Sequence, residues 1–509
     1  MANIGSLGNN LPVNDLNQTR KPASPKTQEQ ANNVSDGVSL GGKQDTTAVD
    51  KKKWTILLYS AADNNLESAL TADVAELEAV GSNKNMNVLV QLDRGEKPSG
   101  ISGGWEGCKR FYLNGDNDTS MINSPSLKDM GQVNMADPKE LADFVEWGIK
   151  NYPAENYMLV MSDHGMGWFG ALEDESHKGW MSMPMIEDAL KTAQKATGEK
   201  INVIGLDACL MGGLEPGYQL REVADYMVAS QNTEGAEGWP YLKIFTSKLM
   251  KEIQRSLDSK FTISPEQVAK KAVNDSAGFS SISTLSAIDL SQMKYVAEAT
   301  DDFARAIMST DTSMVDLRKI ARSTKQWHGF SDQIDFAERI MKDPTITDEN
   351  LKEAAEAMIN AVSDAVIAEY HSPGQKGANG LSLEISPNGG DKAATIKGNK
   401  VKYGDLAFAK DTLWDEAMGP NGLAKGYVPR TKPSAGGGME SMQELADMIN
   451  ALIASGALPV EMINLPPLGL VSEGDALQEQ LSQLFTNDQL IELFPELIPL
   501  AKANNFIES

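Results

Sequence analysis

Short apolar runs and amphipathic segments alternate along the middle of the chain. Five runs rich in β-branched and other large apolar residues have the length of buried strands: residues 54–60, 85–92, 157–161, 201–206 and 226–231. Between them, apolar residues recur at intervals of three or four, as in a helix carrying Leu66, Leu70, Val74 and Leu77. This alternation predicts an α/β fold in which a parallel sheet has helices on both faces.

The same patterns assign the rest of this region. Asp137, Pro138 and Glu140 mark a helix start, because they supply an N-cap, a first-turn proline and a capping-box acid. Other predicted helices are at residues 184–197, from 215, from 264, and at 290–308, 348–369 and 403–418. Other predicted strands are at residues 109–113, near a sheet edge, and at 281–288 and 381–385. Two polar stretches are expected to be a loop and an exposed segment, residues 114–135 and 170–182.

Composition changes at both ends of this region. Residues 1–50 are rich in small and polar residues and poor in large apolar ones, so we predict a disordered tail. Residues 51–418 form the predicted α/β domain, and residues 419–438 contain the glycines and prolines of a linker. Residues 439–509 are predicted to be a helical extension, either a separate module or helices that dock on the domain.

Two of the predicted strands end in residues that suit nucleophilic chemistry. The run 157–161 leads into His164, and the run 201–206 leads into Cys209. In open α/β sheets, ligands bind outside the carboxyl ends of the strands. If the two strands are neighbours, a thiol nucleophile lies beside an imidazole base.

Charge and composition narrow the possible functions. The net charge of −25 argues against nucleic-acid binding and is compatible with cationic substrates. Two cysteines, Cys108 and Cys209, cannot build a disulfide framework, and the four histidines are too widely spaced for a metal motif. We read Cys108 as a structural residue. No apolar run reaches the roughly 18 residues expected of a membrane span.

The strand-end segments DHGMGW and GLDACLMGG resemble the clostripain-type cysteine peptidases, relatives of caspases, legumain and gingipains. Further segments at residues 54–66, 229–241, 378–382 and 403–414 resemble the same family, so the likeness covers roughly residues 54–420. Met166 departs from it, because a glycine is expected there. The resemblance implies a caspase-like αβα sandwich with a mostly parallel sheet. It also implies a cysteine endopeptidase whose catalytic dyad is His164 and Cys209.

The resemblance gives Asp207 a role in substrate recognition. Asp207 lies two residues before Cys209, on the same side of the strand. In the resembled family an acid here lines the primary specificity pocket, which predicts cleavage after Arg and, less specifically, after Lys. The alternative is that Asp207 caps a helix. Glu234 and Glu237 are candidates for a second acid, and Glu237 is slightly favoured because it precedes Gly238-Trp239; both are otherwise exposed loop acids.

Other roles concern the oxyanion, activation and export. The backbone N–H groups of Gly165 and Cys209 are candidates for holding an oxyanion. In the resembled family, a basic residue in the loop after the catalytic histidine is cut by the enzyme itself, and Lys178 is the best candidate; otherwise it is an ordinary solvated lysine. Since family members are commonly secreted, residues 1–50 could direct export without a recognisable signal peptide, with a cytoplasmic protein as the alternative.

Two other kinds of protein remain to be distinguished from the peptidase. One is a catalytically silent caspase-like scaffold that acts as a binding or effector protein. The other is a metal site built from Asp163, His164 and Asp207, which would be a poor zinc site with a single histidine. We therefore assign no metal ligand and no required cofactor. Ca²⁺ is conceivable but unplaced, because the sequence contains no EF-hand loop. The expected partners are peptide or protein substrates with Arg or Lys before the scissile bond, and the oligomeric state is left open.

Overall fold

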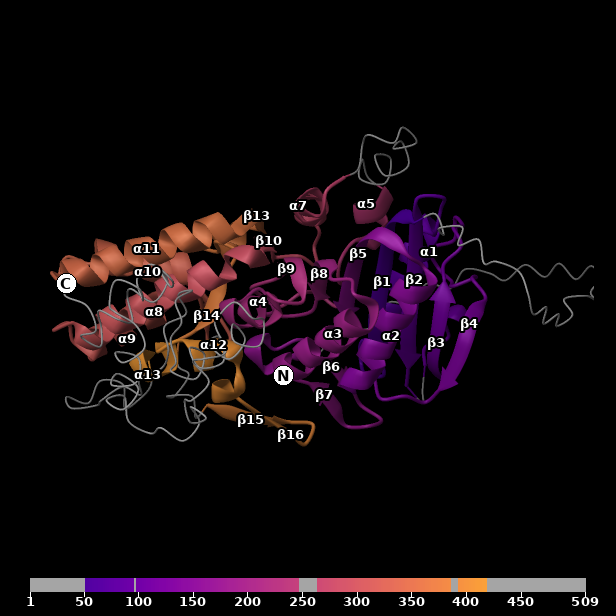
Figure 1. Cartoon of the computed structure of the whole chain (residues 1–509), viewed down its shortest axis with the longest axis horizontal. Helices are drawn as coiled ribbons and strands as arrows, with labels where there is room; N and C mark the ends of the chain where they lie inside the picture. The colour runs from indigo at the N-terminus through magenta and orange to yellow at the C-terminus, as the bar shows by residue number, and fades with distance from the viewer. Residues whose placement is uncertain (1–50, 96–97, 247–262, 386–391, 419–509) are drawn as a thin grey trace, which may run out of the picture. The chain divides into compact units, whose positions relative to one another are not determined.

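A nine-stranded mixed sheet forms the centre of the fold (Figure 1). The computed structural model describes residues 51–95, 98–246, 263–385 and 392–418, so the predicted tail, linker and helical extension lie outside the described residues. The strand order is β13-β10-β9-β8-β5-β1-β2-β3-β4. In chain order these strands are β1 (Lys52–Ala62), β2 (Met86–Arg94), β3 (Gly107–Tyr112), β4 (Ser126–Gly131), β5 (Ala154–Ser162), β8 (Ile201–Asp207), β9 (Ala224–Ala229), β10 (Thr284–Asp289) and β13 (Val366–His371).

The five central strands are parallel, as the apolar runs predicted. β2, β1, β5, β8 and β9 pair in parallel, whereas β3 and β4 on one side and β10 and β13 on the other pair antiparallel. Parallel strands buried on both faces consist of continuous apolar runs, which is why they were recognisable in the sequence. The predicted αβα fold is confirmed, with antiparallel strands added at both edges.

Helices cover both faces of the sheet (Figure 1). Alternate residues of β1 point to opposite faces, so Ile56 packs with α1 on one side and Leu57 packs with α2 on the other. The first layer contains α1 (Glu67–Val80), α5 (Tyr241–Thr246) and α7 (Pro265–Ser276). The second contains α2 (Pro138–Asn151), α3 (Met183–Thr197), α4 (Leu214–Leu220), α8 (Met293–Ser309), α10 (Gln333–Lys342) and α11 (Glu349–Ala365).

The predicted helix starts are present. The Asp137 carboxylate accepts a hydrogen bond from the Lys139 N–H at 2.9 Å and so caps α2. Ser264 and Gln267 form a reciprocal capping box at the start of α7. Among the described residues, no helix is both long and apolar enough to cross a membrane.

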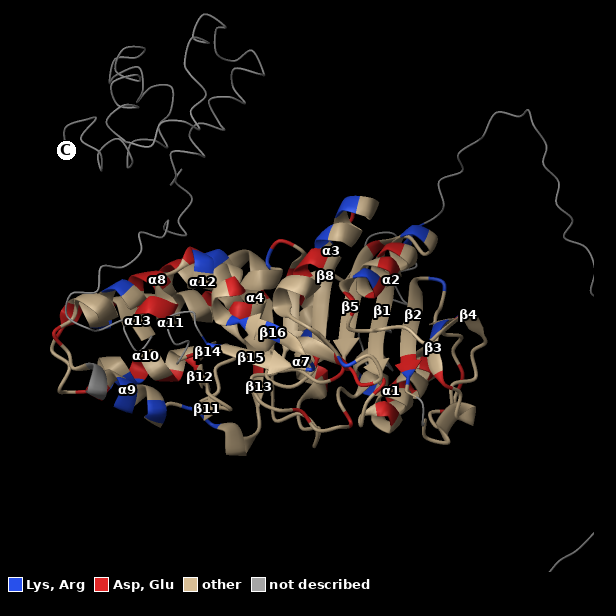
Figure 2. Ribbon diagram, turned by 90° about the horizontal axis from the view of Figure 1, so that it is seen from below, with Lys and Arg blue, Asp and Glu red and all other residues tan. Residues whose placement is uncertain are grey.

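Smaller elements surround the main sheet. A hairpin is formed by β6 (Ala171–Asp174) and β7 (Gly179–Met181). The remaining elements are α9 (Met314–Ser323), β11 (Gln326–Trp327), β12 (Phe330–Asp332), β14 (Ser382–Glu384), β15 (Ala393–Ile396), β16 (Asn399–Lys402), α12 (Ala407–Asp411) and α13 (Trp414–Met418). Acidic residues are seen on helices of both groups, for example on α1 and α8 (Figure 2).

Two polar stretches contain strands that the pattern did not predict. The expected loop at 114–135 includes β4, whose exposed polar residues form an edge strand against β3. The expected exposed segment at 170–182 is the β6–β7 hairpin, in which Asp174 and Trp180 are buried and only the turn is exposed. β4 was not recognised because its side chains are polar, and β6 and β7 were not recognised because they have only four and three residues.

Three later predictions are corrected by tertiary pairing. The helix predicted to reach residue 369 ends at Ala365, and the chain continues as β13 beside β10. The strand at residues 382–384 is real but belongs to a separate small sheet with β12, not to the main one. The predicted helix 403–418 is divided into α12 and α13, where the Leu413 N–H donates to the buried Asp301 carboxylate at 2.6 Å.

Candidate active site

His164 and Cys209 lie beyond the ends of adjacent parallel strands. Ser162, the last residue of β5, pairs with Asp207, the last residue of β8. The Asp163 N–H then donates to the Asp207 carbonyl at 3.2 Å, so the two chains stay side by side as they leave the sheet. The structure therefore brings the imidazole and the thiol to one sheet edge, as predicted for neighbouring strands.

Gly165 lets the two segments approach closely. A Cβ atom at this position would lie 2.6 Å from the Cys209 carbonyl oxygen and 2.8 Å from the Ala208 Cβ atom. Both distances are shorter than side chains tolerate, so only glycine fits here. In the part of the chain that the structure describes, neither the Gly165 N–H nor the Cys209 N–H donates to another residue, so both donors remain available.

Asn65 holds the imidazole ring. His164 Nε2 lies 2.8 Å from the Asn65 Oδ1 atom, and a Glu173 carboxylate oxygen is 4.0 Å from the same nitrogen. Because an amide oxygen can only accept, this contact places a proton on Nε2 and leaves Nδ1 as the basic nitrogen of the neutral ring. Asn65 was missed in the sequence, since it follows the first strand and is distant in the chain from His164.

The Cys209 thiol is partly buried beside Glu234. The Glu234 N–H donates to Sγ at 3.4 Å, and Sγ lies 3.8 Å from the Glu234 carbonyl oxygen. Burial raises the pKa of Cys209, an effect that the Glu234 N–H offsets in part. The group at rest is therefore a thiol that needs a base. Within the described residues the sulfur makes no hydrogen bond to the His164 ring, a contact that in many apo enzymes forms only with substrate.

Two buried acids, Asp207 and Glu234, lie near the thiol, and a third lies near Asp207. Asp207 is only 4% exposed and accepts hydrogen bonds from the Tyr241 hydroxyl at 2.7 Å and the Ser162 hydroxyl at 3.2 Å. Burial raises the pKa of Asp207, and burial and then the charge of Asp207 raise the pKa of Glu234 well above its usual range. The two acids interact closely enough for Asp207 to favour the protonated form of Glu234.

The third acid is Asp73 on α1, which the sequence analysis did not consider. It is 5% exposed, and burial followed by the charge of Asp207 raises its pKa well above the ordinary value. One carboxylate oxygen of Asp73 and one of Glu234 have no hydrogen-bond partner. No lysine or arginine among the described residues pairs with this group, which we call the Asp207 cluster: Asp73, Asp207 and Glu234.

The predicted preference between the two glutamates is not supported by the positions of their side chains. Glu237 is exposed, whereas Glu234 lies against Asp207. Between them the chain folds over Asp207: Gly238 has φ +53°, and a Cβ atom there would lie 2.9 Å from an Asp207 carboxylate oxygen. The site therefore pairs Asp207 with Glu234.

The sequence also left two other roles open for acids near the site: a helix cap at Asp207 and a metal site that includes Asp163. Helix α4 has Gly213 at its N-cap and no side-chain cap, so Asp207 caps no helix. Asp163 accepts hydrogen bonds from the Asn64 side chain at 2.7 Å and from the Glu173 N–H, so it is directed away from Asp207. The only group of three potential metal ligands among the described residues is a different one, formed by Asp63, Asp174 and His177.

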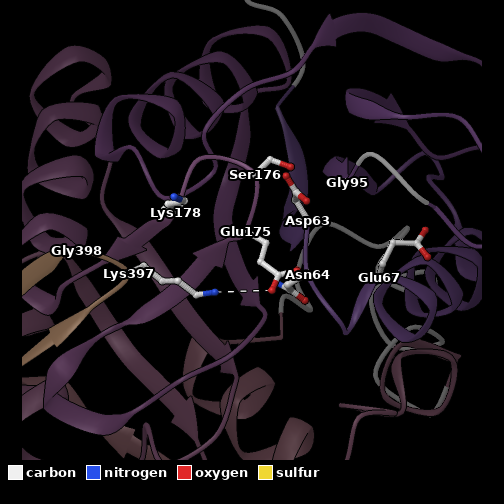
Figure 3. Close-up of a pocket in the computed structure, with 9 residues that line it drawn as sticks. All are labelled: Asp63, Asn64, Glu67, Gly95, Glu175, Ser176, Lys178, Lys397 and Gly398. Atoms are coloured by element: carbon white, nitrogen blue, oxygen red, sulfur yellow. Dashed lines mark ion pairs between the residues drawn. The ribbon is translucent and has the colours of Figure 1, made fainter.

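Lys178 lies in the exposed turn between β6 and β7. Its backbone has φ +54°, and its N–H donates to the Glu175 carbonyl at 3.2 Å, which closes the turn. Its side chain borders a cleft of about 720 Å³, together with Asp63, Asn64 and Lys397 (Figure 3). The residue is accessible, but the turn is not the extended conformation that a peptidase binds.

Comparisons with known proteins were made for the whole chain. The sequence model of the Clostripain family matches residues 58–420. Clostripain from Hathewaya histolytica is 26% identical over 448 residues, which cover 75% of this chain and 83% of that protein.

Solved structures that are similar include two C11 cysteine proteases. A secreted C11 cysteine protease from Bacteroides thetaiotaomicron, in complex with an irreversible peptide inhibitor, has a TM-score of 0.46 and 21% identity, covering 65% of this chain and 92% of that one. An inactive zymogen C11 protease from Parabacteroides distasonis has a TM-score of 0.49 and 20% identity, covering 71% and 98%.

Proposed function

The chain belongs to the clostripain family and is a cysteine peptidase; from this premise we propose that it cleaves peptide bonds after Arg, and less efficiently after Lys. We assign Cys209 as the nucleophile and His164 as the general base. The observation that carries the specificity is the Asp207 cluster. It buries three acids, two of them near the thiol, with no lysine or arginine among the described residues to pair with them.

The reaction begins with proton transfer from Cys209 to Nδ1 of His164. The thiolate then attacks the scissile carbonyl carbon, and the Gly165 and Cys209 N–H groups stabilise the oxyanion that forms. The imidazolium protonates the leaving amine, which departs and leaves a thioester. Water, deprotonated by His164, hydrolyses the thioester and releases the thiol. Asn65 keeps the Nε2 proton in place, so that Nδ1 remains the nitrogen that exchanges protons.

A substrate arginine would supply the cation that the Asp207 cluster lacks. Its guanidinium is planar and carries donors in a fixed fork, so it can bond Asp207 and Glu234 at the same time. Binding of this cation favours loss of the proton that the raised pKa of Glu234 retains. Lysine offers one point charge, reaches fewer acceptors and is the weaker substrate.

We further propose that the enzyme cuts its own chain after Lys178. The turn is exposed and carries a cationic side chain that suits the same pocket. Since peptidases bind extended substrates, the β6–β7 hairpin must open before the cut, within one molecule or between two. The cut separates Asp174 and Glu175 from β7.

The test uses full-length wild type, Cys209→Ala and Lys178→Ala. Fluorogenic peptides ending in Arg, Lys, Asp, Asn or Ala report specificity, and a denaturing gel with mass spectrometry reports the cut. We expect wild type to cleave after Arg and Lys and to split at Lys178, Lys178→Ala to remain one chain at that position, and Cys209→Ala to do neither. Silence of wild type in the presence of reductant would favour the binding scaffold. Cleavage after Asp or Asn would contradict the specificity.

Export of the protein is a separate proposal. One similar protein is described as secreted, and we propose that this peptidase also acts outside the cytoplasm on protein substrates. Detection of the intact protein in culture medium, without release of a cytoplasmic marker enzyme, would support this. Retention of the protein with the cytoplasmic marker would contradict it.

A further inference from the structure

A second group of titratable side chains lies outside the proposed catalytic machinery. One potential ligand atom from each of Asp63, Asp174 and His177 lies within 4.8 Å of the other two. Asp63 follows β1, Asp174 ends β6, and His177 belongs to the hairpin turn. Both acids are almost fully buried, at 4% and 0% exposed, while the histidine is accessible.

Asp93 on β2 is a further buried acid in the neighbourhood, although it is not one of the three residues whose ligand atoms lie within 4.8 Å of one another. It is fully buried, and neither of its carboxylate oxygens has a hydrogen-bond partner. Alternation along the strand places it on the same side as Gly95, where a Cβ atom would lie 2.2 Å from an Asp63 carboxylate oxygen. Burial, and then the charges of Asp174 and Asp63, raise the pKa of Asp93 to about 8.

The group has unused oxygen atoms and no cationic side chain. The Asp63 Oδ2 atom has no partner, although Ser176 hydrogen-bonds the same carboxylate. No lysine or arginine of the described residues pairs with these acids, and Lys397, across the cleft, instead pairs with Glu173 at 2.5 Å and Glu175 at 3.7 Å (Figure 3).

Asp174 is already oriented by its neighbours. Its two oxygens accept hydrogen bonds from the His177 N–H at 2.8 Å and from the Met135 N–H at 3.0 Å. The His177 Nδ1 atom lies 2.9 Å from the first of these oxygens. Ligand atoms about 2.1 Å from one metal ion lie roughly 3 to 4 Å apart, so small side-chain rotations would bring this group to coordinating geometry.

We propose that Asp63, Asp174 and His177 bind a divalent cation, with Asp93 as a nearby acid that adds negative charge. We call the four residues the Asp63 cluster: Asp63, Asp93, Asp174 and His177. The mixture of carboxylates and one imidazole suits Mn²⁺ or Zn²⁺ better than Ca²⁺, which takes oxygen ligands alone. The ion enters from the cleft that Asp63 borders (Figure 3). It balances the charge of the buried acids and binds only after they lose their protons.

Such an ion would connect the end of β1 to the β6–β7 hairpin. The two are already joined by hydrogen bonds from the Glu175 N–H to the Asp63 carbonyl at 2.8 Å and from the Asn64 side chain to the Glu173 carbonyl at 3.3 Å. Coordination by Asp63 on one side and by Asp174 and His177 on the other adds a stronger connection across the same gap. We therefore expect the bound ion to slow opening of the hairpin that carries Lys178.

The test uses full-length Cys209→Ala, which cannot cut itself, after removal of metals with EDTA. Titration calorimetry with MnCl₂, ZnCl₂ or CaCl₂ alone measures affinity, and pulsed electron paramagnetic resonance of bound Mn²⁺ detects an imidazole nitrogen ligand. We expect Mn²⁺ and Zn²⁺ to bind and the nitrogen signal to disappear in His177→Ala. Asp93→Asn should weaken binding roughly tenfold or more. Amide hydrogen exchange at residues 171–181 should slow when metal is bound.

Asp143→Asn, at an exposed acid on α2, is the matched control and should bind metal like the parent. His177→Ala is the ligand variant because its side chain is exposed, so its loss should not unfold the domain. Absence of binding by all three ions, or equal binding by parent, His177→Ala and Asp93→Asn, would overturn the site. Preferential Ca²⁺ binding without a nitrogen signal would overturn the proposed ligands. These outcomes do not depend on peptidase activity.

Discussion

The molecule contains two buried acidic clusters, and their neighbours differ. Both the Asp207 cluster and the Asp63 cluster hold carboxylate oxygens without partners and have no paired lysine or arginine among the described residues. The first lies beside the Cys209 thiol and is bordered by Tyr241, Trp239 and Gly238. The second includes an imidazole within reach of its acids.

This comparison indicates where each missing cation would come from. Burying a charge without a partner costs several kcal/mol, so two such clusters in one domain call for an explanation other than stability. Beside a nucleophile, the cation can arrive on the side chain of a substrate. Next to an imidazole, at the base of a cleft, it can arrive as a free metal ion. The predictions below test whether the clusters are as different as their surroundings indicate.

The largest effect is expected for Asp207→Asn. Loss of one partner of a buried charge pair costs roughly 2–5 kcal/mol, so kcat/KM for arginine peptides should fall about 10²–10³-fold. Metal binding by the Asp63 cluster should not change. Peptide hydrolysis and calorimetry on the same protein check both statements, with Asp143→Asn as the control. Retention of arginine cleavage within a few fold would remove the difference between the clusters.

Glu234→Gln should have a smaller effect that depends on pH. The raised pKa of Glu234 means that the pair loses charge at a higher pH than ordinary carboxyl groups, so KM for arginine peptides should rise as pH falls. Glutamine carries no charge and can donate a hydrogen bond to Asp207, so it lowers the pKa of Asp207. The pH below which KM rises should therefore be lower in the variant than in wild type. At neutral pH we expect about a tenfold loss of kcat/KM, comparable to one charged hydrogen bond.

The pH profile of Cys209 alkylation by iodoacetamide separates this effect from titration of the thiol. It should be nearly the same in wild type and in the glutamine variant. If the KM profile remains at its wild-type position in Glu234→Gln, the proposed pairing of Glu234 with Asp207 is contradicted.

Asn65→Ala tests the residue that connects the two regions. Asn65 follows Asp63 by two positions and holds His164 as a positioning residue. We expect kcat to fall roughly tenfold with KM little changed, because ring orientation affects proton transfer and not substrate binding. Asn65→Asp, which restores an acceptor for Nε2–H, should recover most of the rate. Steady-state kinetics check this, and a rise in KM with unchanged kcat would contradict it.

The smallest effect is on stability and concerns Asp73→Asn. The pKa of Asp73 is raised in the folded protein, which therefore retains a proton that the unfolded chain releases. The free energy of unfolding consequently falls as pH rises from the unfolded-state pKa of Asp73 to its folded-state pKa. Asparagine does not ionise. The variant should therefore melt roughly 2–4 °C above wild type at neutral pH, with a smaller difference in acid. Thermal melts from pH 5 to 8 measure this, and a difference that shrinks as pH rises would contradict it.

Much of the fold could be predicted because its signals are local. The central strands are continuous apolar runs, and α2 and α7 begin at residues that cap their first turns. The polar strand β4, the short strands β6 and β7 and the strand β13 could not be predicted, because their pairing partners are set by the fold and not by their own patterns.

The chain by itself determined where His164, Cys209 and Asp207 would lie, since residues that follow parallel strands of one sheet meet at one edge. Tertiary structure alone decided which distant groups join them: Asn65 at the imidazole, Glu234 instead of Glu237 beside Asp207, and the buried Asp93 near Asp63. The reason is physical. A strand end is a local property of the sequence, whereas the loss of water around a carboxylate depends on every segment that packs over it.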